Sequence, residues 1–427
     1  MRDKRIYLDP IHGGIVLNRT KEEERVLIEL IDTPEFQRLR HIKQLGLAFF
    51  TFHGAEGSRF THSLGVLHIT RQLLSYLQET CPRVTSYRTA ALCAALLHDI
   101  GHGPFSHATE DIIGYDHEDW TIRILTEDTA INYILAKYQK DLPEQVSQVI
   151  KKEFRPQYIC HLISSQLDCD RFDYLLRDSY LTGTEYGRFD LQRVLISLEI
   201  DEEHDQILVS DEKGKNPVED YLFARYSMFI QVYHHRKNWA AKTHLERILL
   251  RARERSNKLG YCDATVRKWL MGEPISAREY LELDDSTLWY HIKQWAKDPD
   301  EIVSDLSRRF LCRKLFKAEQ IPPDLGLEKS EKLYSEAREL VKRSGFHPEY
   351  YLASVKSVDR PYDYYRPEED KPRTSIVIKS RTGQRLEISA ISELVGALVK
   401  GKFVKEWLIF PPEIAPEMTR IIEPYQA

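Results

Sequence analysis

The sequence lacks an apolar stretch long enough to cross a membrane, because its longest apolar run, Ala90–Leu97, is far shorter than the roughly 20 residues of a spanning helix. The N-terminal segment MRDKRIYLDP contains no apolar stretch of the signal-peptide type. The six cysteines are scattered without a CxxC pair, which argues against a disulfide framework and against a thiolate zinc site. We therefore expect a cytoplasmic protein with no membrane partner.

An excess of positive charge is also lacking. The chain has 61 Lys and Arg against 66 Asp and Glu, a net charge of −5, so a nucleic-acid partner is not expected. Hydrophobic residues make up 42% of the 427 positions and aromatic residues 11%, which excludes a wholly disordered chain. At roughly 100–200 residues per domain, this length predicts two or three structural units.

Helical periodicity dominates before residue 340. Leucines at spacings of three and seven give 62–77 an amphipathic stripe, and 86–100 is apolar nearly all round, as a helix at the centre of a bundle would be. The segment 218–258 contains neither Gly nor Pro and predicts one or two long helices. The best strand signal in this part is a small hairpin that pairs 195–200 with 206–210.

The end of the chain has a different pattern. Strands are expected at 375–379, 385–389 and 405–410, with a helix at 392–400. Prolines among acids and tyrosines predict an exposed loop near 359–373. The expected fold is therefore mainly α, a helical bundle with a small hairpin over residues 1–325 and a smaller α+β unit over 326–427.

Histidines gather where the apolar helix ends. The run LLHDIGHGPFSH (96–107) places His98 beside Asp99 at a helix terminus, where both side chains can turn toward one metal ion. A third ligand must come from another helix, and His62 stands at the start of one. A single buried histidine is usually a core residue with satisfied hydrogen bonds, but the five histidines at 62, 98, 102, 107 and 117 with matching acids indicate a metal site.

A fourth ligand is expected from 165–181. There Asp170, Tyr174 and Asp178 recur every four residues and so share one face of a helix. Two imidazoles and two carboxylates suit a six-coordinate divalent ion with open water positions better than a closed structural zinc site.

These motifs resemble those of the HD-domain phosphohydrolases. More narrowly, they resemble the deoxynucleoside triphosphate triphosphohydrolases typified by the sterile-alpha-motif and HD-domain protein. The matching stretches are DPIHG (9–13), IDTPEFQRLRHIKQLG (31–46), RFTHSLGV (59–66), LLHDIGHGPFSH (96–107) and DCDRFDYLLRD (168–178). The resemblance continues through 225–237 and more weakly into the C-terminal unit. It implies an HD-domain helical bundle that hydrolyses dNTPs to deoxynucleoside and inorganic triphosphate.

The resemblance also implies roles for the histidines and acids. The metal ligands would be His62, His98, Asp99 and Asp170, and the divalent ion would be Mn, Fe, Mg, Zn or Ni. The catalytic residues would be His102, His107, Glu110 and His117. The first two would lie against the α-phosphate, and His117 would donate a proton or orient the water. A carboxylate would hold His117, and Glu110 stands where the family usually has Asp.

Substrate contacts are expected at both ends of the nucleotide. Candidates for the polyphosphate are Arg59, Arg171, Arg225 and Lys237, with Arg236 as a further possibility, because guanidinium and ammonium groups suit phosphate oxygens. For the sugar, the resemblance implies Gln44 and Asp178 at the 3′-hydroxyl, Tyr174 and Tyr233 packing on the ring, and Leu45 filling the space of a 2′-hydroxyl. Each arginine has the alternative of a solvated surface charge, and Leu45 and Tyr174 that of core residues.

In the better-known relatives, nucleotides also bind at subunit contacts and promote a tetramer. The corresponding residues are Arg5, Asp32, Gln37 and Arg40. We expect them to take an activator of the GTP or dGTP type, in a homo-oligomer that is a dimer or a tetramer. The alternative is a polar helix face that is only hydrated or salt-bridged.

Two other functions remain open from the sequence. The same metal site can serve a hydrolase of another nucleotide, namely a mono-, cyclic or modified one. The fold can also serve as a non-catalytic module that binds nucleotides or nucleic acid, although such a module has no need of the catalytic histidines.

Overall fold

The computed structural model describes residues 3–210, 212–359, 362, 375–400 and 403–426. Helices predominate in these residues, which confirms the predicted mainly α fold class. None of the described helices combines the length and the apolar character that crossing a membrane requires. The loop expected at 359–373 lies outside the described residues except for Asp359, which ends a strand, and Tyr362, which is buried.

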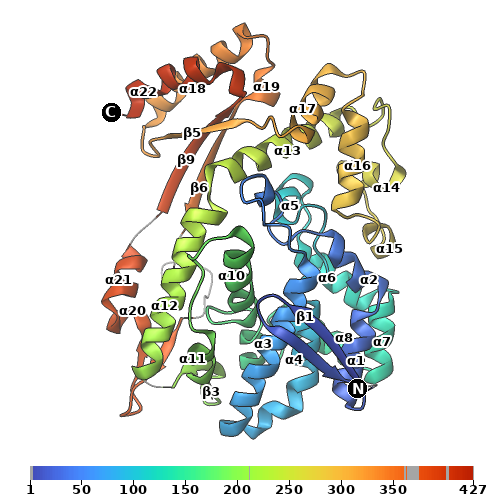
Figure 1. Cartoon of the computed structure of the whole chain (residues 1–427), viewed down its shortest axis with the longest axis vertical. Coiled ribbons are helices and arrows are strands. Elements are labelled where there is room, and N and C mark those ends of the chain that lie inside the picture. The colour runs from blue at the N-terminus through green and yellow to red at the C-terminus, as the bar shows by residue number, and fades with distance from the viewer. Residues whose placement is uncertain (1–2, 211, 360–361, 363–374, 401–402, 427) are drawn as a thin grey trace.

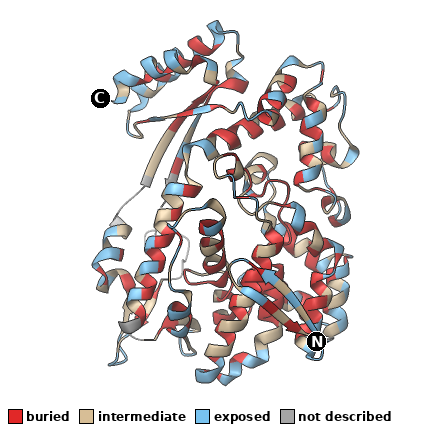
Figure 2. Cartoon of the chain, viewed as in Figure 1, coloured by how far each residue is buried: buried red, intermediate tan, exposed pale blue. Residues whose placement is uncertain are grey.

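The centre of the bundle is formed by α3 (Arg59–Thr80), α4 (Arg88–Leu97), α8 (Leu142–Ile150) and α10 (Cys169–Thr182). Helix α3 contacts α4 and α10, and α4 also packs against α8. Every side chain of α4 from Ala90 to Leu97 is buried, because this helix is apolar on all sides (Figure 2). The predictions for 62–77 and 86–100 are therefore confirmed as central helices.

Further helices surround this centre: α1 (Glu22–Ile31), α2 (Pro34–Arg38), α5 (His107–Ile113), α6 (His117–Thr126), α7 (Ala130–Tyr138), α9 (Gln157–His161) and α11 (Leu191–Ile196). The turn between α4 and α5 carries the HD motif. Gly101 is needed in this turn because a Cβ atom there would lie 2.2 Å from the backbone oxygen of His117. The N-terminus of α6 can therefore lie directly against the motif.

The segment predicted as one or two long helices forms α12 (Glu212–Met228) and α13 (Arg236–Glu254). A π-helical turn, η4 (Phe229–Tyr233), separates them. Such turns are frequent at functional sites because they redirect side chains from the regular helix surface. The chain continues through α14 (Ala264–Met271), α15 (Ala277–Tyr280), α16 (Asp285–Trp295) and α17 (Glu301–Leu311).

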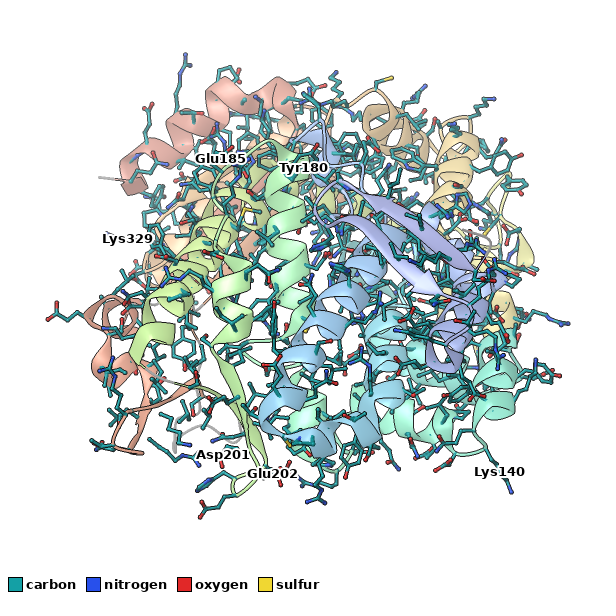
Figure 3. The ribbon with its side chains drawn as sticks, turned by 60° about the horizontal axis from the view of Figure 1, so that its bottom comes forward. Lys140, Tyr180, Glu185, Asp201, Glu202 and Lys329 are labelled. Atoms are coloured by element: carbon teal, nitrogen blue, oxygen red, sulfur yellow. The ribbon has the colours of Figure 1, made fainter. Side chains whose placement is uncertain are left out.

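Three small sheets accompany the helices in the described residues. At the N-terminus, β1 (Lys4–Asp9) pairs with β2 (Gly13–Asn18). The predicted hairpin is present as β3 (Leu198–Asp201) and β4 (Gln206–Val209), and Figure 3 shows Asp201 and Glu202 at its tip. Two C-terminal strands, β7 (Val377–Lys379) and β8 (Arg385–Glu387), extend this hairpin into a four-stranded sheet.

The third sheet joins distant parts of the chain. Its central strand β9 (Phe403–Phe410) lies between β5 (Lys317–Ile321) and β6 (Ala353–Asp359), and the helices nearby are α18 (Leu327–Arg343), α19 (Pro348–Tyr351) and α22 (Ala415–Gln426) (Figure 1). The helices α20 (Ile388–Ile391) and α21 (Glu393–Lys400) lie instead near β8 and α12. The described strands beyond residue 326 are thus divided between two sheets. Each of these two sheets also includes at least one strand that precedes residue 326. The domain boundary near residue 325 stays a prediction.

Candidate active site

Three elements bring the predicted metal ligands together. His62 lies in the first turn of α3, His98 and Asp99 follow α4, and Asp170 begins α10. Ligand atoms of His62, His98 and Asp99 all lie within 4.8 Å of one another. Oδ1 of Asp170 is 3.0 Å from Nε2 of His62 and 3.5 Å from Nε2 of His98. Four side chains from three separate segments of the chain therefore converge on one point.

The histidine tautomers fit a metal ion at this point. Nδ1 of His98 lies 3.0 Å from the carbonyl oxygen of Ala95, which can only accept, so Nδ1 carries the hydrogen. Nδ1 of His62 likewise donates to Oδ2 of Asp173, at 2.8 Å. Both Nε2 atoms are buried without a hydrogen-bond partner. Each therefore presents a lone pair to the converging carboxylates, as a metal-binding histidine requires.

Asp173 organises the support behind His62. Its fully buried carboxylate also contacts Nε2 of His12 at 2.6 Å and accepts two hydrogen bonds from Arg177. Arg177 in turn donates to Asp9 at 2.8 Å. The DPIHG motif, which includes Asp9 and His12, is therefore linked to a metal ligand through Asp173. These contacts and the charge of Arg177 outweigh burial and hold the pKa of Asp173 well below its usual range.

The glycine of RFTHSLGV makes room for this support. A Cβ atom on Gly65 would lie 1.8 Å from Oδ1 of Asp173. Our reading of the sequence missed Asp173 as a functional residue. The available signal was its place between Asp170 and Tyr174 in the DCDRFDY run, but the spacing does not show that Asp173 faces His62.

The carboxylate of Glu110 contacts the three predicted catalytic histidines, His102, His107 and His117. Its Oε1 atom lies 3.0 Å from Nδ1 of His102 and 3.1 Å from Nδ1 of His117. Its Oε2 atom lies 2.8 Å from Nδ1 of His107. Burial favours the neutral carboxyl group, yet these three imidazoles hold the pKa of Glu110 well below its usual range. Glutamate at this position reaches all three rings.

The histidines differ in their surroundings. The rings of His102 and His117 stack at 3.9 Å, and that of His107 lies edge-on to His102 at 4.8 Å. Burial and the charge of Arg59 lower the pKa of His102 to about 3, which keeps this imidazole neutral at pH 7. Burial opposes the charged form of His117 as well, but its hydrogen bond with Glu110 raises the pKa of His117.

A cavity of about 550 Å³ opens beside these groups. From the metal and catalytic sets, its walls include Asp99, Asp170, His102, His107 and His117. From the predicted substrate contacts, its walls include Gln44, Leu45, Arg59, Tyr174, Asp178 and Tyr233. Its size falls in the range of small-molecule sites, on the order of 300–1,000 Å³.

Two acceptors in this cavity have no partner. Oε1 of Gln44 and Oδ1 of Asp178 are buried and make no hydrogen bond within the described chain. The other oxygen of Asp178 accepts a 2.9 Å hydrogen bond from the hydroxyl group of Tyr233. Burial raises the pKa of Asp178 to about 7. A ligand hydroxyl group can therefore donate to either orphan oxygen, and burial of an unpaired acceptor is costly without one.

The predicted polyphosphate residues do not all reach the cavity. Arg59 lines it, donates to Oγ of Ser106 at 2.8 Å and pairs with Asp99. Arg171 and Arg225 do not line it. Arg171 donates to the carbonyl oxygen of Ser165 and pairs with Asp168, and Arg225 donates to Oε1 of Gln166 at 2.7 Å.

Arg236 and Lys237 line a second cavity of about 350 Å³ and not the first. The lysine that does line the first cavity is Lys242, which sequence reasoning did not single out. Lys242 lies in α13 near Trp239, with its ammonium group 5.6 Å from the centre of the indole ring. No motif marks it, so only the packing of α13 against α5 reveals it.

The predicted activator residues gather in two pairs. Nη1 of Arg5, in β1, lies 2.7 Å from Oδ2 of Asp32. Nε of Arg40 donates to Oε1 of Gln37 at 2.7 Å, and the guanidinium group of Arg40 lies 3.6 Å from the ring centre of Phe60. Within the single chain, one pair is thus a salt bridge, as the alternative considered, and the other is a hydrogen bond between a guanidinium group and a neutral amide.

Comparison with known proteins identifies the same architecture. The HD domain family model matches residues 59–178. The uncharacterized protein YwfO of Bacillus subtilis is 39% identical over 424 residues, which cover 98% of this chain and 95% of YwfO. Human deoxynucleoside triphosphate triphosphohydrolase SAMHD1 is 27% identical over 72% of this chain, and the match spans 54% of that protein. A crystal structure of a phosphohydrolase from Bacteroides thetaiotaomicron superposes with a TM-score of 0.80, at 28% identity over 95% of this chain and 99% of that one.

Proposed function

The chain belongs to the HD-domain phosphohydrolase family, and on this basis we propose that it hydrolyses dNTPs to deoxynucleoside and inorganic triphosphate. Its cofactor is a divalent metal ion, in keeping with the HD domain and the histidine and aspartate donors. We propose His62, His98, Asp99 and Asp170 as the residues that hold it. When bound, the ion supplies Lewis acidity at a phosphoryl group. Mn, Fe, Mg, Zn and Ni all accept such mixed nitrogen and oxygen ligands.

One observation carries the proposal. A single cavity is lined by two of the proposed metal donors, Asp99 and Asp170, and by the residues of two orphan acceptors, Oε1 of Gln44 and Oδ1 of Asp178. The acceptors suit a sugar hydroxyl group, whereas the histidines and Arg59 suit a phosphate chain. Leu45 lines the same cavity, and an apolar side chain beside the sugar leaves a 2′-hydroxyl group without a partner. These features support a deoxynucleotide with its phosphates toward the metal ligands.

The catalytic residues would divide the work as follows. His102 and His107 would contact the α-phosphate. His117 would donate a proton to the departing oxygen or orient the water, with Glu110 holding its ring. The raised pKa of His117 supports the protonated form that a donor needs. For the remaining phosphates, Arg59 and Lys242 line the cavity, whereas Arg171, Arg225 and Lys237 would need to act from outside its walls.

The proposal extends to regulation and location. An activator of the GTP or dGTP type would bind near Arg5, Asp32, Gln37 and Arg40 in a dimer or tetramer, where it would have to open the two surface pairs described above. All six cysteines carry free thiols, which supports a cytoplasmic location.

The decisive experiment is a product assay. The purified chain is incubated with each dNTP and NTP, singly and in pairs, with Mn²⁺ or Mg²⁺, and the products are read by mass. Inorganic triphosphate and a deoxynucleoside are expected from at least one dNTP, and none from the His98→Ala variant. Orthophosphate or pyrophosphate would favour a hydrolase of another nucleotide. Tight binding of an oligonucleotide in chelator, without turnover, would favour a non-catalytic module.

The activator needs its own measurement. GTP or dGTP is added to a second dNTP substrate while the rate of triphosphate release and the mass of the protein are followed together. A higher rate with a larger assembly is expected. If neither changes, the activator site is wrong.

A further inference from the structure

Helix α16 places a buried carboxylate, that of Asp285, behind two backbone segments of the cavity wall. Oδ1 of Asp285 accepts a 2.7 Å hydrogen bond from the backbone nitrogen of Phe105. Oδ2 of the same residue accepts a 3.0 Å hydrogen bond from the backbone nitrogen of Lys43. Asp285 is only 4% exposed, and it lies 180 residues from Phe105 along the chain. One side chain therefore joins two segments that are remote in sequence.

The two segments line the same cavity, and we propose different roles for them. The sugar loop, residues 43–46, carries Gln44 and Leu45, and the phosphate turn, residues 102–107, begins with His102 and ends with His107. All four of these side chains line the cavity. The spacing between the sugar loop and the phosphate turn thus sets where a nucleoside lies relative to the catalytic histidines.

The sugar loop and the phosphate turn also touch directly. Oγ of Ser106 donates to the carbonyl oxygen of Lys43 at 3.0 Å. A Cβ atom on Gly46 would lie 2.9 Å from the carbonyl oxygen of Phe105, so the two backbones are in close contact there. Their spacing is consequently sensitive to any change in the hydrogen bonds between them.

The phosphate turn needs such support because its backbone is strained. Phe105 and Ser106 have φ angles of +56° and +53°, which residues other than glycine rarely adopt and which surrounding contacts must maintain. Asp285 holds the backbone nitrogen of Phe105. One helical turn later, Trp289 packs edge-on against the ring of Phe105, with the ring centres 5.4 Å apart. Asp285 and Trp289, four residues apart on one face of α16, therefore both contact Phe105 in the phosphate turn.

We propose that Asp285 is a positioning residue that fixes the distance between the sugar wall at Leu45 and the histidines of the phosphate turn, and so sets both the rate and the preference for deoxyribose. This inference rests on the proposed function for the identity of the substrate. A carboxylate is required because its two oxygens accept two N–H groups at once. In Asp285→Asn the amide keeps one acceptor and turns an N–H donor toward the second backbone nitrogen.

The test compares Asp285→Asn with Asp284→Ala in the full chain. Asp284 caps the same helix by accepting from the backbone nitrogen of Thr287 at 2.8 Å, and it contacts neither the sugar loop nor the phosphate turn through any hydrogen bond of the described residues. Asp284→Ala therefore weakens α16 without touching the bridge. The readout is kcat/KM for dATP divided by kcat/KM for ATP, or the same ratio for whichever base the wild type accepts, together with the thermal midpoint.

We expect Asp285→Asn to lower kcat for the deoxynucleotide about ten- to a hundredfold, as small displacements of reacting groups do. Its deoxy-to-ribo ratio should fall about tenfold or more, whereas Asp284→Ala should keep the wild-type ratio even if its thermal midpoint falls equally. An unchanged ratio in folded Asp285→Asn overturns the inference, as does an equal fall of the ratio in both variants.

A second variant covers the case in which Asp285→Asn does not fold. Ser106→Ala removes the direct hydrogen bond between the sugar loop and the phosphate turn, together with the hydrogen bond that Oγ accepts from Arg59. Because the deoxy and ribo substrates carry the same phosphates, the loss at Arg59 affects both rates alike, and the same fall of the ratio is expected. A wild-type ratio in Ser106→Ala would then overturn the inference. Failure of the proposed function is distinguishable, because in that case the wild type itself releases no triphosphate from any dNTP.

Discussion

Nδ1 of His62 and Oδ2 of Asp173 lie 2.8 Å apart, and this contact determines which nitrogen of the imidazole faces the other proposed metal ligands. The two residues are 111 positions apart in sequence and lie on neighbouring helices, α3 and α10. Asp173 is in turn held by Arg177 and His12. The orientation of one ligand therefore depends on a buried network that begins in the N-terminal hairpin.

We expect Asp173→Asn to weaken metal binding about ten- to a hundredfold, the usual effect of removing a carboxylate behind a histidine ligand. A neutral asparagine amide lacks the negative charge with which the Asp173 carboxylate binds His62, His12 and Arg177. Competitive titration with Mn²⁺ measures the affinity. Asp190→Asn, at the cap of α11, serves as the control and should bind the metal as the wild type does. Wild-type affinity in Asp173→Asn would refute the orienting role.

A second experiment should distinguish the role of the proposed metal ligands from that of His117. His98→Ala and Asp170→Ala should each lose both the metal and turnover, because three remaining ligands hold a divalent ion poorly. His117→Ala should retain the metal and lose rate by roughly 10²–10⁴-fold, the range for a general acid or base. Elemental analysis and product assays measure the two properties. Full metal content in His98→Ala would contradict its assignment as a ligand, and loss of metal in His117→Ala would contradict the catalytic role.

Leu45→Ala should relax the choice of sugar. Removing the isobutyl group leaves room for a 2′-hydroxyl group, so kcat/KM for NTPs should rise relative to dNTPs by about tenfold or more. The rate with a dNTP in the same variant is the internal control, since the deoxy substrate never needed that space. A ratio equal to that of the wild type would show that Leu45 does not limit the sugar pocket.

Asp178→Asn should stabilise the chain most at neutral pH. Burial raises the pKa of Asp178 to about 7, so the folded state binds a proton that the unfolded state releases near pH 4. The free energy of unfolding of the wild type should therefore fall as the pH rises from 4 to 7, because the folded state must release this proton. The variant has no such group and should not show this fall. Chemical denaturation in EDTA at pH 5 and pH 8 should show the variant's advantage widening by on the order of 2 kcal/mol. An advantage independent of pH would show that Asp178 titrates normally.

Removal of the metal offers a test that needs no substitution. Exhaustive dialysis against EDTA should abolish turnover, and Mn²⁺ or Mg²⁺ should restore it. Undiminished cleavage by chain that elemental analysis shows to be metal-free would refute the ligand set and the proposed reaction together.

The local patterns of the sequence predicted much of the fold and most of the side chains that meet at the candidate site. The apolar helix before His98 and the stripe from Asp170 to Asp178 follow from a period of 3.6 residues, and the helices α4 and α10 occupy these segments. The motifs marked His62, His98 and Asp99 as candidate ligands because these residues stand at helix ends, His62 in the first turn of α3 and the other two directly after α4. In the segment 218–258, the break between α12 and α13 could not be predicted, because the π-helical turn that separates them contains neither Gly nor Pro.

By itself the sequence determined many of the helices and the hairpin β3–β4, and it marked the side chains that we propose for the chemistry, because helix periodicity, turn residues and donor types are properties of neighbouring residues. Only the tertiary structure decided that Asp173 and Asp285 stand behind the site and that Arg171 and Lys237 do not line its cavity. It also decided that β7 and β8 complete the sheet of a hairpin more than 160 residues earlier. The physical reason is that these contacts join residues far apart along the chain, and their geometry is set by packing that no local spacing records.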